Sequence, residues 1–489
     1  MEKGKGIYNV VVIGAGTAGL VTAAGTAGLG GRVALIERAR MGGDCLNTGC
    51  VPSKALIATS RRIYAIRTAP LLGLNEIEPS FDFKTVMDRM RSRRAVIEPH
   101  DSQERFEGLG IDVFRGDASF IDAHSVKVGD DILRARNFVI ATGGRAAVPP
   151  IEGINDVPYH TNETIFDELH DQPARLAVIG GGPIGTELSQ VFSRLGTQVT
   201  LFEAGPVILS KEDADVGEFA QDVLKEEGIT IHDDTRVTKA SRSDRGAIQL
   251  EYETNPNGVG RLEVDAILVA AGRQPNIETL NLDKIDVQTN RSGVMVNARL
   301  QTTQPHIYAA GDVAGSYQFT HWADAQARIV IRNILMPSWL PFLHGKIDDR
   351  VVPWCTYIEP EVASVGLNET RAKEKGIAYD LWQLDMKTMD RAIVSDETQG
   401  FVKVLTKKGT DQLLGVNIVG HHAGELIHEF VLAMQCNIGL AKLSSTIHAY
   451  PTMAEIAKRL GDQFNKTKLS PTVSKVFGWM YRRAIRNMK

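Results

Sequence analysis

A glycine pattern that occurs twice limits the fold of this chain more than any other feature. In each copy an apolar run leads into three glycines with the spacing GxGxxG, and a stretch of small residues leads to a second apolar run. Each second run ends in an acidic residue 18 positions beyond the third glycine. The first copy contains Gly14, Gly16, Gly19 and Glu37, and the second contains Gly180, Gly182, Gly185 and Glu203.

This order of segments indicates a strand, a glycine turn, a helix and a second strand. The first glycine allows a tight turn, the second lets the backbone approach a pyrophosphate, and the third lets the helix pack on the strand. The N–H groups at the helix N-terminus bind the anion, and the acid binds a ribose diol. The repeat therefore predicts an α/β protein with two Rossmann-type domains, each of which binds a dinucleotide.

A second motif places Cys45 and Cys50 in a segment bracketed by glycines and followed by Pro52. Three interpretations remain open: a structural disulfide, a zinc site and a redox pair. The chain of 489 residues is long enough to fold without disulfides, and its other cysteines, Cys355 and Cys436, are isolated in the sequence. The redox pair is therefore favoured.

The stretch from Gly42 to Lys54 resembles the active-site disulfide of the FAD-dependent pyridine-nucleotide disulfide oxidoreductases, which include dihydrolipoamide dehydrogenase, glutathione reductase and mercuric reductase. The resemblance implies that a nicotinamide nucleotide reduces FAD, which reduces the disulfide. It makes Cys50 the flavin-proximal thiolate and Cys45 the interchange thiol. It also assigns Lys54 to stabilising charge on the reduced flavin, with Glu187 as its ion-pair partner.

Further segments extend the resemblance over residues 8 to 460. Ala141 to Gly144 is similar to a turn that touches the flavin nucleotide in the family. Ala266 to Asn276 resembles the segment that returns from the nicotinamide-binding domain to the FAD domain. Ile307 to Asp312 resembles the strand whose final aspartate binds the ribityl chain of FAD. His321 lies at the start of a helix that would face the flavin, and is a candidate substrate contact. The implied contacts to the two nucleotides are Gly14, Gly16, Gly19, Glu37, Gly43, Thr48, Lys54, Thr142, Gly143, Asp312, Gly180, Gly182, Gly185, Glu203 and Gly272.

The identity of the nicotinamide nucleotide is predicted by Glu203. A carboxylate at this position accepts hydrogen bonds from a free 2′-hydroxyl and repels a 2′-phosphate. No arginine lies between Glu203 and Lys211. We therefore expect NADH rather than NADPH.

The segment from His448 to Glu455 departs from the pattern of the disulfide-reducing members, which have His-Pro-Thr-x-x-Glu. Tyr450 stands where they have the histidine base, and Glu455 stands where a glutamate orients that base. A phenol with a pKa of about 10 is a poor base at neutral pH. Mercuric reductases have a similar tyrosine, so the resemblance favours a mercuric-reductase-like member, although the cysteine pair that usually ends those enzymes is not found here. His448 is an alternative base.

The residue pattern predicts helices over residues 55–110, an antiparallel meander over 111–138 and strands at 401–405 and 413–419.

The resemblance also divides the chain. We expect an FAD-binding domain in residues 1–150 and 273–350, a nicotinamide-binding domain in 151–272, an α+β dimerisation domain in 351–470 and a basic amphipathic tail in 471–489. A homodimer follows, in which Tyr450 and Glu455 complete the site of the other subunit. The few cysteines predict a cytoplasmic location, and the excess of Asp and Glu (59) over Lys and Arg (55) argues against nucleic acid as a partner.

The electron acceptor is left open between a small disulfide, a soft metal ion and a quinone. Two other hypotheses are a dihydrolipoamide-dehydrogenase-type component of a larger complex, and a flavin-binding redox sensor or scaffold without turnover. Two interpretations also remain for residues 473–489, a segment that contains both apolar and basic residues. The segment is either a terminal helix packed on its own dimer or an amphipathic helix in peripheral contact with a membrane.

Overall fold

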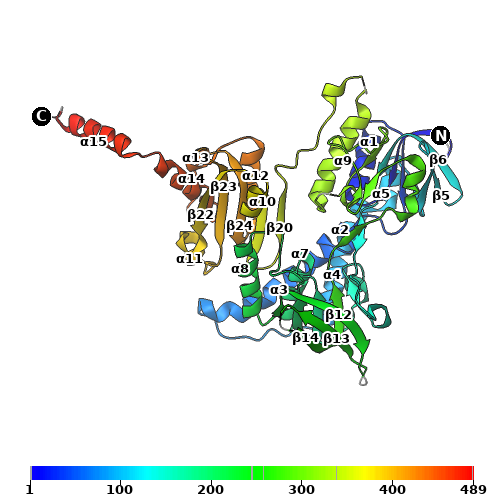
Figure 1. Cartoon of the computed structure of the whole chain (residues 1–489), viewed down its shortest axis with the longest axis horizontal. Coiled ribbons are helices and arrows are strands. Elements are labelled where there is room, and N and C mark those ends of the chain that lie inside the picture. Colours follow the sequence, from blue (N-terminus) through cyan, green and yellow to red (C-terminus); the bar gives the residue numbers. More distant parts are fainter. Residues whose placement is uncertain are drawn as a thin grey trace. The chain divides into compact units, whose positions relative to one another are not determined.

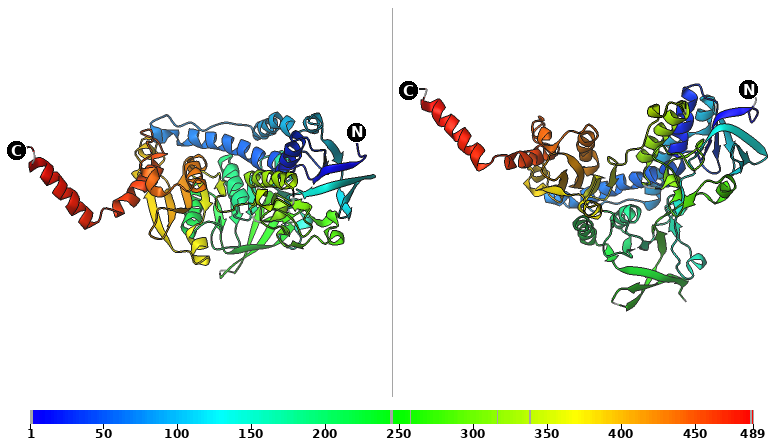
Figure 2. Two further views of the ribbon diagram at one scale, coloured as in Figure 1. Left: turned by 90° about the horizontal axis from the view of Figure 1, so that it is seen from above. Right: turned by 45° about the horizontal axis from the view of Figure 1, so that its top comes forward.

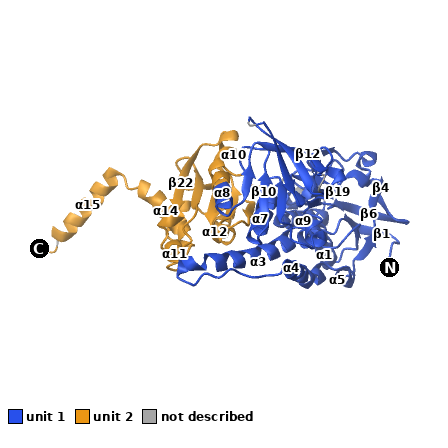
Figure 3. Ribbon diagram, turned by 90° about the horizontal axis from the view of Figure 1, so that it is seen from below, with its two compact units in different colours: residues 1–210, 220–348 blue, residues 211–219, 349–489 orange. Residues whose placement is uncertain are grey.

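The computed structural model describes residues 3–243, 246–256, 258–315, 317–337, 339–486 and 488. The chain forms two compact units, which Figure 3 distinguishes by colour. Unit 1 comprises residues 1–210 and 220–348, and unit 2 comprises residues 211–219 and 349–489. The structure is mixed α/β with parallel sheets, as the sequence predicted.

The first sheet of unit 1 has the strand order β3-β2-β1-β6-β5-β4, and β19 also pairs with β6. Its parallel part consists of β3 (Asp112–Arg115), β2 (Val33–Glu37), β1 (Ile7–Ile13), β6 (Asp131–Ile140) and β19 (Ile307–Ala309).

The strands β4 (Ala118–Asp122) and β5 (Ser125–Val128) form an antiparallel meander with β6. The sequence predicted a meander over residues 111–138, which is confirmed except for β3, because β3 joins β2 in parallel. Figure 1 shows α1 (Thr17–Gly28) and α9 (Thr320–Leu335) side by side.

Helices occupy most of the region predicted to be helical, residues 55–110. They are α3 (Cys50–Thr68), α4 (Phe83–Ile97) and α5 (Gln103–Gly108), with the short helix α2 (Gly43–Asn47) before them. Both views in Figure 2 show α3 as one continuous helix. Helix α4 begins after Asp82, whose carboxylate accepts a hydrogen bond from the backbone N–H of Thr85.

The second sheet of unit 1 is parallel and has the order β11-β10-β9-β15-β8. Helix α7 (Pro183–Arg194) follows β9, and its proline stands at the start of the helix, where the missing N–H costs no hydrogen bond. Between β11 and β15 in the sequence, the strands β12, β13 and β14 form a separate antiparallel sheet. The strands are β8 (His160–Thr161), β9 (Arg175–Ile179), β10 (Gln198–Phe202), β11 (Thr230–His232), β12 (Thr235–Arg242), β13 (Ile248–Thr254), β14 (Gly258–Val264) and β15 (Ala266–Val269).

Unit 2 is built on an antiparallel sheet with the order β20-β21-β24-β23-β22. Phe430 on α12 and Phe464 on α14 are buried in the core that these helices form with the sheet. The predicted strands at 401–405 and 413–419 are confirmed as β23 and β24. The elements are β20 (Pro353–Thr356), β21 (Glu361–Gly366), α10 (Glu369–Glu374), β22 (Tyr379–Asp385), α11 (Asp390–Val394), β23 (Phe401–Lys407), β24 (Leu413–Gly420), α12 (Ala423–Gln435), α13 (Leu440–Ser444), α14 (Glu455–Thr467) and α15 (Pro471–Arg486).

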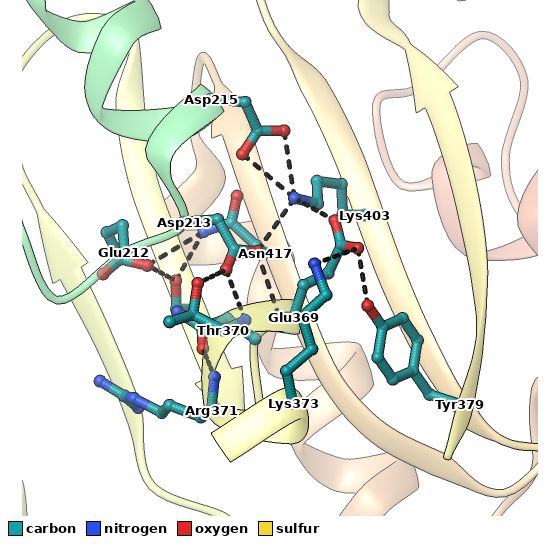
Figure 4. Close-up of polar contacts among 12 residues, drawn as sticks. Glu212, Asp213, Asp215, Glu369, Thr370, Arg371, Lys373, Tyr379, Lys403 and Asn417 are labelled. Carbon is teal, nitrogen blue, oxygen red and sulfur yellow. Dashed lines mark hydrogen bonds and ion pairs between the residues drawn. The ribbon is translucent and has the colours of Figure 1, made fainter. Parts of the chain in front are cut away.

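A segment from the middle of the chain, residues 211–219, belongs to unit 2 and is held there by a buried charge cluster (Figure 4). The ammonium of Lys403 lies 2.9 Å from Asp213, 3.1 Å from Asp215 and 2.8 Å from Glu369. The Lys403 side chain is only 2% exposed. Helix α8 (Ala214–Glu226) begins within this segment and ends in unit 1.

Candidate active site

The two cysteines of the motif are brought together at the start of α3. Cys45 lies in α2, and Cys50 is the first residue of α3. Both are free thiols in the structure, and they interact closely enough for each to shift the pKa of the other. Two neighbouring thiols, able to exist as a dithiol or as a disulfide, are what the redox interpretation requires.

The two thiols differ strongly in acidity. The hydrogen bond from Cys45 lowers the pKa of Cys50 to about 6, and the Thr320 hydroxyl and the charge of Lys54 act in the same direction against the effect of burial. The same hydrogen bond, together with burial, raises the pKa of Cys45. At neutral pH the pair therefore holds one proton on Cys45 and one negative charge on Cys50.

Two helix N-termini converge on the sulfur of Cys50. Cys50 begins α3, and its sulfur lies 3.4 Å from the hydroxyl of Thr320, the first residue of α9. Helix N-termini favour negative charge because their free N–H groups carry the positive end of the helix dipole. Thr320 was not predicted to be a site residue, although the segment around His321 was expected to begin a helix.

Lys54 and Glu187 form an ion pair. The Lys54 ammonium lies 2.7 Å from the Glu187 carboxylate, whose side chain is 6% exposed. Lys54 stands one helical turn after Cys50 on α3, and Glu187 lies on α7. The pair that the resemblance implied is thus present, and it connects the cysteine helix to the helix that follows the second glycine turn.

The first glycine turn leaves its middle position open. A Cβ added to Gly14, whose φ is +105°, would lie 2.3 Å from the carbonyl oxygen of Ala141, and one added to Gly19 would lie 1.8 Å from the carbonyl oxygen of Gly14. A Cβ added to Gly16 would meet only the Cα of Gly43, at 3.8 Å. The outer glycines are therefore needed for backbone packing, and the middle glycine borders free space.

The second turn has the same geometry. A Cβ on Gly180 would lie 2.6 Å from the carbonyl oxygen of Ala270, and one on Gly185 would lie 1.9 Å from that of Gly180, while one on Gly182 would have no atom within 4 Å. This agreement in two independent turns fits the approach of a pyrophosphate to each middle glycine.

The acids that follow the two turns bind backbone N–H groups in the structure. Glu37 accepts hydrogen bonds from Ala15 and Ala39, both at 2.7 Å. Glu203 accepts from Gly181 at 2.7 Å and from Gly205 at 2.8 Å. Each carboxylate thus supports its own turn, and its remaining lone pairs are able to accept the hydroxyls of a ribose.

A partly buried charge group lies next to the first turn. Arg273 contacts Asp44 and Gly144, and it lies 3.3 Å from Asp312. Burial raises the pKa of Asp312 against the opposing charge of Arg273. Within the described residues the Nε of Arg273 is buried without a hydrogen-bond partner. This orphaned donor and the open face of Gly16 fit a polar ligand such as the ribityl and pyrophosphate part of FAD.

Other predicted nucleotide contacts lie in nearby turns. The Thr142 hydroxyl donates a hydrogen bond of 2.7 Å to the backbone carbonyl of Asn276, and the side-chain amide of Asn276 donates one of 3.0 Å to the backbone carbonyl of Thr142. Thr48 donates its N–H to the carbonyl of Asp44 at the end of α2. The remaining positions are glycines with positive φ: Gly43, Gly143 and Gly272.

The candidate proton-transfer residues near the end of the chain belong to unit 2. The side chain of Tyr450 is 71% exposed, and its hydroxyl donates a hydrogen bond of 3.3 Å to Asp390 rather than to Glu455. The charge of Asp390 raises the pKa of Tyr450, so still less of the phenol is ionised and able to accept a proton at neutral pH. One oxygen of Glu455 is buried and has no hydrogen-bond partner among the described residues.

The two histidines have different surroundings. His448 has partners on both ring nitrogens, with Glu429 at 3.0 Å and the carbonyl oxygen of Thr446 at 3.0 Å. Its ring would have to turn before it accepted a proton from a thiol. His321 is exposed on the first turn of α9, where its ring stacks on Phe319 at 5.3 Å. Over the described ranges the structure contains no group of three or more His, Cys, Asp or Glu arranged to hold a metal ion.

The comparisons with known proteins agree with this geometry. Residues 8–327 match the family model described as pyridine nucleotide-disulphide oxidoreductase, and residues 352–460 match the dimerisation domain of that family. A mercuric reductase of Staphylococcus aureus is 36% identical over 95% of this chain and 84% of its own length. A dihydrolipoyl dehydrogenase of Chlamydia trachomatis is 34% identical over 92% of this chain and 95% of its own length.

A solved structure is also similar over nearly the whole chain. It is a Cu(II) complex of the HOCl-induced flavoprotein disulfide reductase RclA from Escherichia coli, with a TM-score of 0.82 and 29% identity, and it covers 94% of this chain and 100% of that chain. The repeated glycine turns, the polarised cysteine pair and the two family models lead to one assignment. The chain belongs to the class I pyridine nucleotide-disulphide oxidoreductases, a family of enzymes that bind FAD and use pyridine nucleotides.

Proposed function

We propose that this protein is an NADH-dependent flavoenzyme that reduces a soft metal ion through the Cys45–Cys50 pair. The observation that carries the proposal is the unequal acidity of the two thiols, combined with a tyrosine where a disulfide-reducing relative would have a base. Such a site supplies thiolate ligands for a metal ion, but it lacks an efficient group for moving protons to and from a small thiol.

The proposed reaction balances over one turnover. NADH gives up two electrons and one proton and becomes NAD⁺, bound FAD would carry the electrons to the cysteine pair, and with a second proton from water the disulfide becomes a dithiol. With Hg(II) as the acceptor, the two electrons reduce one ion to elemental mercury, both thiol protons are released and the pair returns to the disulfide; with Cu(II) the same two electrons reduce two ions to Cu(I). A small disulfide would take the two electrons and both protons and leave as two thiols.

The chain's own residues divide the work at the sulfurs. Cys50 is the thiolate that faces the flavin, stabilised by Thr320 and by the N-terminus of α3. Cys45 is the interchange thiol that meets the acceptor. Lys54, held by Glu187, places positive charge close to Cys50. The fit of FAD is supported by the open face of Gly16 and by the buried, unpartnered Nε of Arg273, and bound FAD would supply the relay between nicotinamide and sulfur.

The preference for NADH is supported by Glu203. Its carboxylate is fixed at the end of β10 by backbone N–H groups of Gly181 and Gly205, so it cannot turn away from a 2′-phosphate without losing both hydrogen bonds. A 2′-phosphate would therefore be repelled, while a 2′-hydroxyl has acceptor oxygens available.

Two relatives support a metal ion as the acceptor. The mercuric reductase of Staphylococcus aureus and the copper complex of RclA connect the family with thiophilic metals. We therefore propose Hg(II) and Cu(II) as the first ions to test. The homodimer is part of the proposal: Tyr450 and Glu455 of each subunit would complete the site of the other, as the family's dimerisation domain suggests.

The proposal is tested with a panel of acceptors. Purified holoprotein is assayed with Hg(II), Cu(II), lipoamide, glutathione disulfide and a quinone, with NADH and NADPH in parallel. Fast reduction of a metal ion with NADH supports the proposal. Faster turnover of lipoamide or glutathione disulfide than of either metal ion would overturn the choice of acceptor, and faster turnover with NADPH would overturn the choice of nucleotide.

The second candidate function is a dihydrolipoamide dehydrogenase, which the 34% identical chlamydial relative favours. The panel separates it from a metal reductase because reduction of lipoamide requires proton transfer to the thiol that leaves. A redox sensor without turnover is the third candidate. Anaerobic titration with NADH tests it, since a disulfide-linked flavoenzyme takes up four electrons per FAD and a variant with Cys50→Ser takes up two.

A further inference from the structure

The C-terminal helix α15 separates apolar from basic side chains around its axis. Positions that are three, four, seven or eleven residues apart share one face of an α-helix. This spacing places one apolar row on one face: Val473, Phe477, Met480 and Ala484. It places one basic row on the opposite face: Lys475, Arg482 and Arg486. The helix is therefore amphipathic over its whole length.

Nothing in unit 2 covers the apolar face over the described part of α15. None of its described residues is buried. The exposed fractions are 52% for Val476, 50% for Phe477, 52% for Met480 and 64% for Ile485. The matched dimerisation domain ends at residue 460, and the core of unit 2 ends with Phe464. The fold of the domain is thus complete without α15, which leaves this helix available for an external partner.

The charge of the segment selects the kind of partner. Residues 463–489 contain seven basic side chains and no acidic one, which leaves 48 basic against 59 acidic residues in the first 462. An anionic surface attracts the tail and repels the rest of the chain. At physiological ionic strength these forces act within about 8 Å, so the tail would be the segment that approaches such a surface.

We propose that α15 lies flat on the surface of a lipid bilayer that contains anionic lipids. The apolar row would enter the boundary between head groups and acyl chains, to a depth of about 5–10 Å. The basic row would face the phosphates, and Trp479, which shares the face of Arg482 and Arg486, would lie at the level of the head groups, where indole rings are favoured. No described helix of the chain is long and apolar enough to cross a membrane. The contact is therefore peripheral, and it stands apart from the proposed chemistry.

A second copy of α15 is a weaker fit to the same face. Paired helices bury a narrow seam and hold together over at least three or four heptads. Helix α15 spans 16 residues, which is little more than two heptads. Its apolar arc is also wider than a seam, because it extends over Val476, Tyr481 and Ile485. A bilayer covers the whole arc, whereas a partner helix would leave these side chains in water.

The proposal is tested by flotation of the holoprotein with lipid vesicles. One set of vesicles is pure phosphatidylcholine, and the other also contains phosphatidylglycerol. The full chain is expected to float with the anionic vesicles at low salt and to be released at high salt, while a chain stopped at Ser470 stays in solution in all conditions. Equal flotation of the two chains would overturn the proposal.

Point variants separate the two faces of the helix. The change Arg482→Ser with Arg486→Ser is expected to lower the vesicle partition coefficient about 30-fold, because each cation near an anionic surface contributes about 1 kcal/mol. The change Phe477→Glu with Met480→Glu should abolish binding. Lys127→Ser with Arg134→Ser removes the same charge from exposed positions of β5 and β6 and should leave binding unchanged.

Two further measurements distinguish the membrane contact from a contact between subunits. The emission of Trp479 should shift to shorter wavelength with anionic vesicles, measured as the difference from a Trp479→Phe variant. Sedimentation should give the same oligomeric state with and without α15. A truncated chain that dissociates while the full chain fails to float would show that the helix is a subunit contact. NADH-dependent turnover in solution should be equal in all these variants, so its loss would concern the catalytic proposal alone.

Discussion

At the scale of single residues, the site depends on where one proton rests. Cys45 and Cys50 share a hydrogen bond that makes Cys50 the acidic member of the pair. The Thr320 hydroxyl and the Lys54 ammonium stabilise the thiolate further, while Glu187 and burial oppose it. The charge on Cys50 is thus a balance among neighbours from four helices, and a change in any one neighbour should be measurable on the sulfur.

We expect Thr320→Val to raise the pKa of Cys50, because the hydroxyl that donates to the thiolate is removed. The pH dependence of iodoacetamide alkylation of the reduced enzyme measures this, since the thiolate forms as the pH rises through the pKa. In the unchanged protein the reactive form should appear above about pH 6. Thr320→Ser keeps the hydroxyl and serves as the control. A midpoint that is the same in the Val and Ser variants would contradict the role of Thr320.

Part of this site was predictable from the sequence, because its elements are local. Cys45, Cys50 and Lys54 lie within one short segment with a recognisable spacing. Thr320 and Arg273 were missed, since each reaches the site from a position more than 200 residues away, and neither stands out in its own segment. Tyr450 was recognised by its position in a motif, but its hydrogen bond to Asp390 on α11 had no signal in the sequence.

At the scale of elements, the two glycine turns show why the same three positions recur. In both turns the outer glycines face backbone atoms and the middle one faces space. The sequence predicted both turns, their strands and their helices because every constraint there is a local one. It did not predict that β3 joins β2 in parallel, or that residues 211–219 belong to unit 2, because both depend on contacts between distant segments.

The two kinds of glycine should respond differently to alanine. Gly182→Ala should fold and keep its FAD, with a KM for NADH raised about tenfold, because the methyl group enters the space left for the pyrophosphate. Gly185→Ala should destabilise the protein by about 1–3 kcal/mol, because its Cβ would lie 1.9 Å from the carbonyl oxygen of Gly180. Steady-state kinetics and thermal unfolding measure the two effects. Equal losses of stability would contradict this distinction.

The charge cluster around Lys403 leads to a prediction about stability. Burial disfavours the charge of Lys403, but Glu369, Asp213 and Asp215 outweigh it and raise its pKa. Burial also opposes the charge of Asp213, but hydrogen bonds from Thr370 and Lys403 lower its pKa. Lys403→Met should therefore cost about 3–5 kcal/mol, measured by urea unfolding, because it leaves the buried carboxylate of Asp213 and its two partly exposed neighbours without a cation.

The pH dependence of this effect has a definite sign. A carboxylate with a lowered pKa stabilises the fold above its unfolded pKa of about 4, and this contribution is lost as the pH falls. The unchanged protein should thus lose stability below about pH 4. In Lys403→Met the uncompensated carboxylates gain from protonation, so acidification from neutral pH should first stabilise the variant. Addition of Asp213→Asn should recover part of the loss at neutral pH, and no recovery would contradict the electrostatic explanation.

At the scale of the whole molecule, substrate choice is expected to depend on Tyr450 in the assembled dimer. We predict that Tyr450→His raises dihydrolipoamide oxidation about 100-fold, because a positioned imidazole is a general base near neutral pH. The gain should appear as the pH rises through about 6.5, and reduction of Hg(II) should not improve. Tyr450→Phe is the control that removes the hydroxyl without adding a base. An equal gain in both variants would show that shape, rather than proton transfer, limits the disulfide reaction.

The path of the chain through residues 211–219 affects how this protein can be recombined with its relatives. Helix α8 starts in one unit and finishes in the other, and two of the three acids around Lys403 come from its first turn and the residue before it. A contiguous cassette of residues 349–489 would carry the lysine without these counterions. Exchange of the C-terminal module between homologues would therefore require two pieces, residues 211–219 and residues 349–489. Chimeras that take both pieces from the same parent should fold.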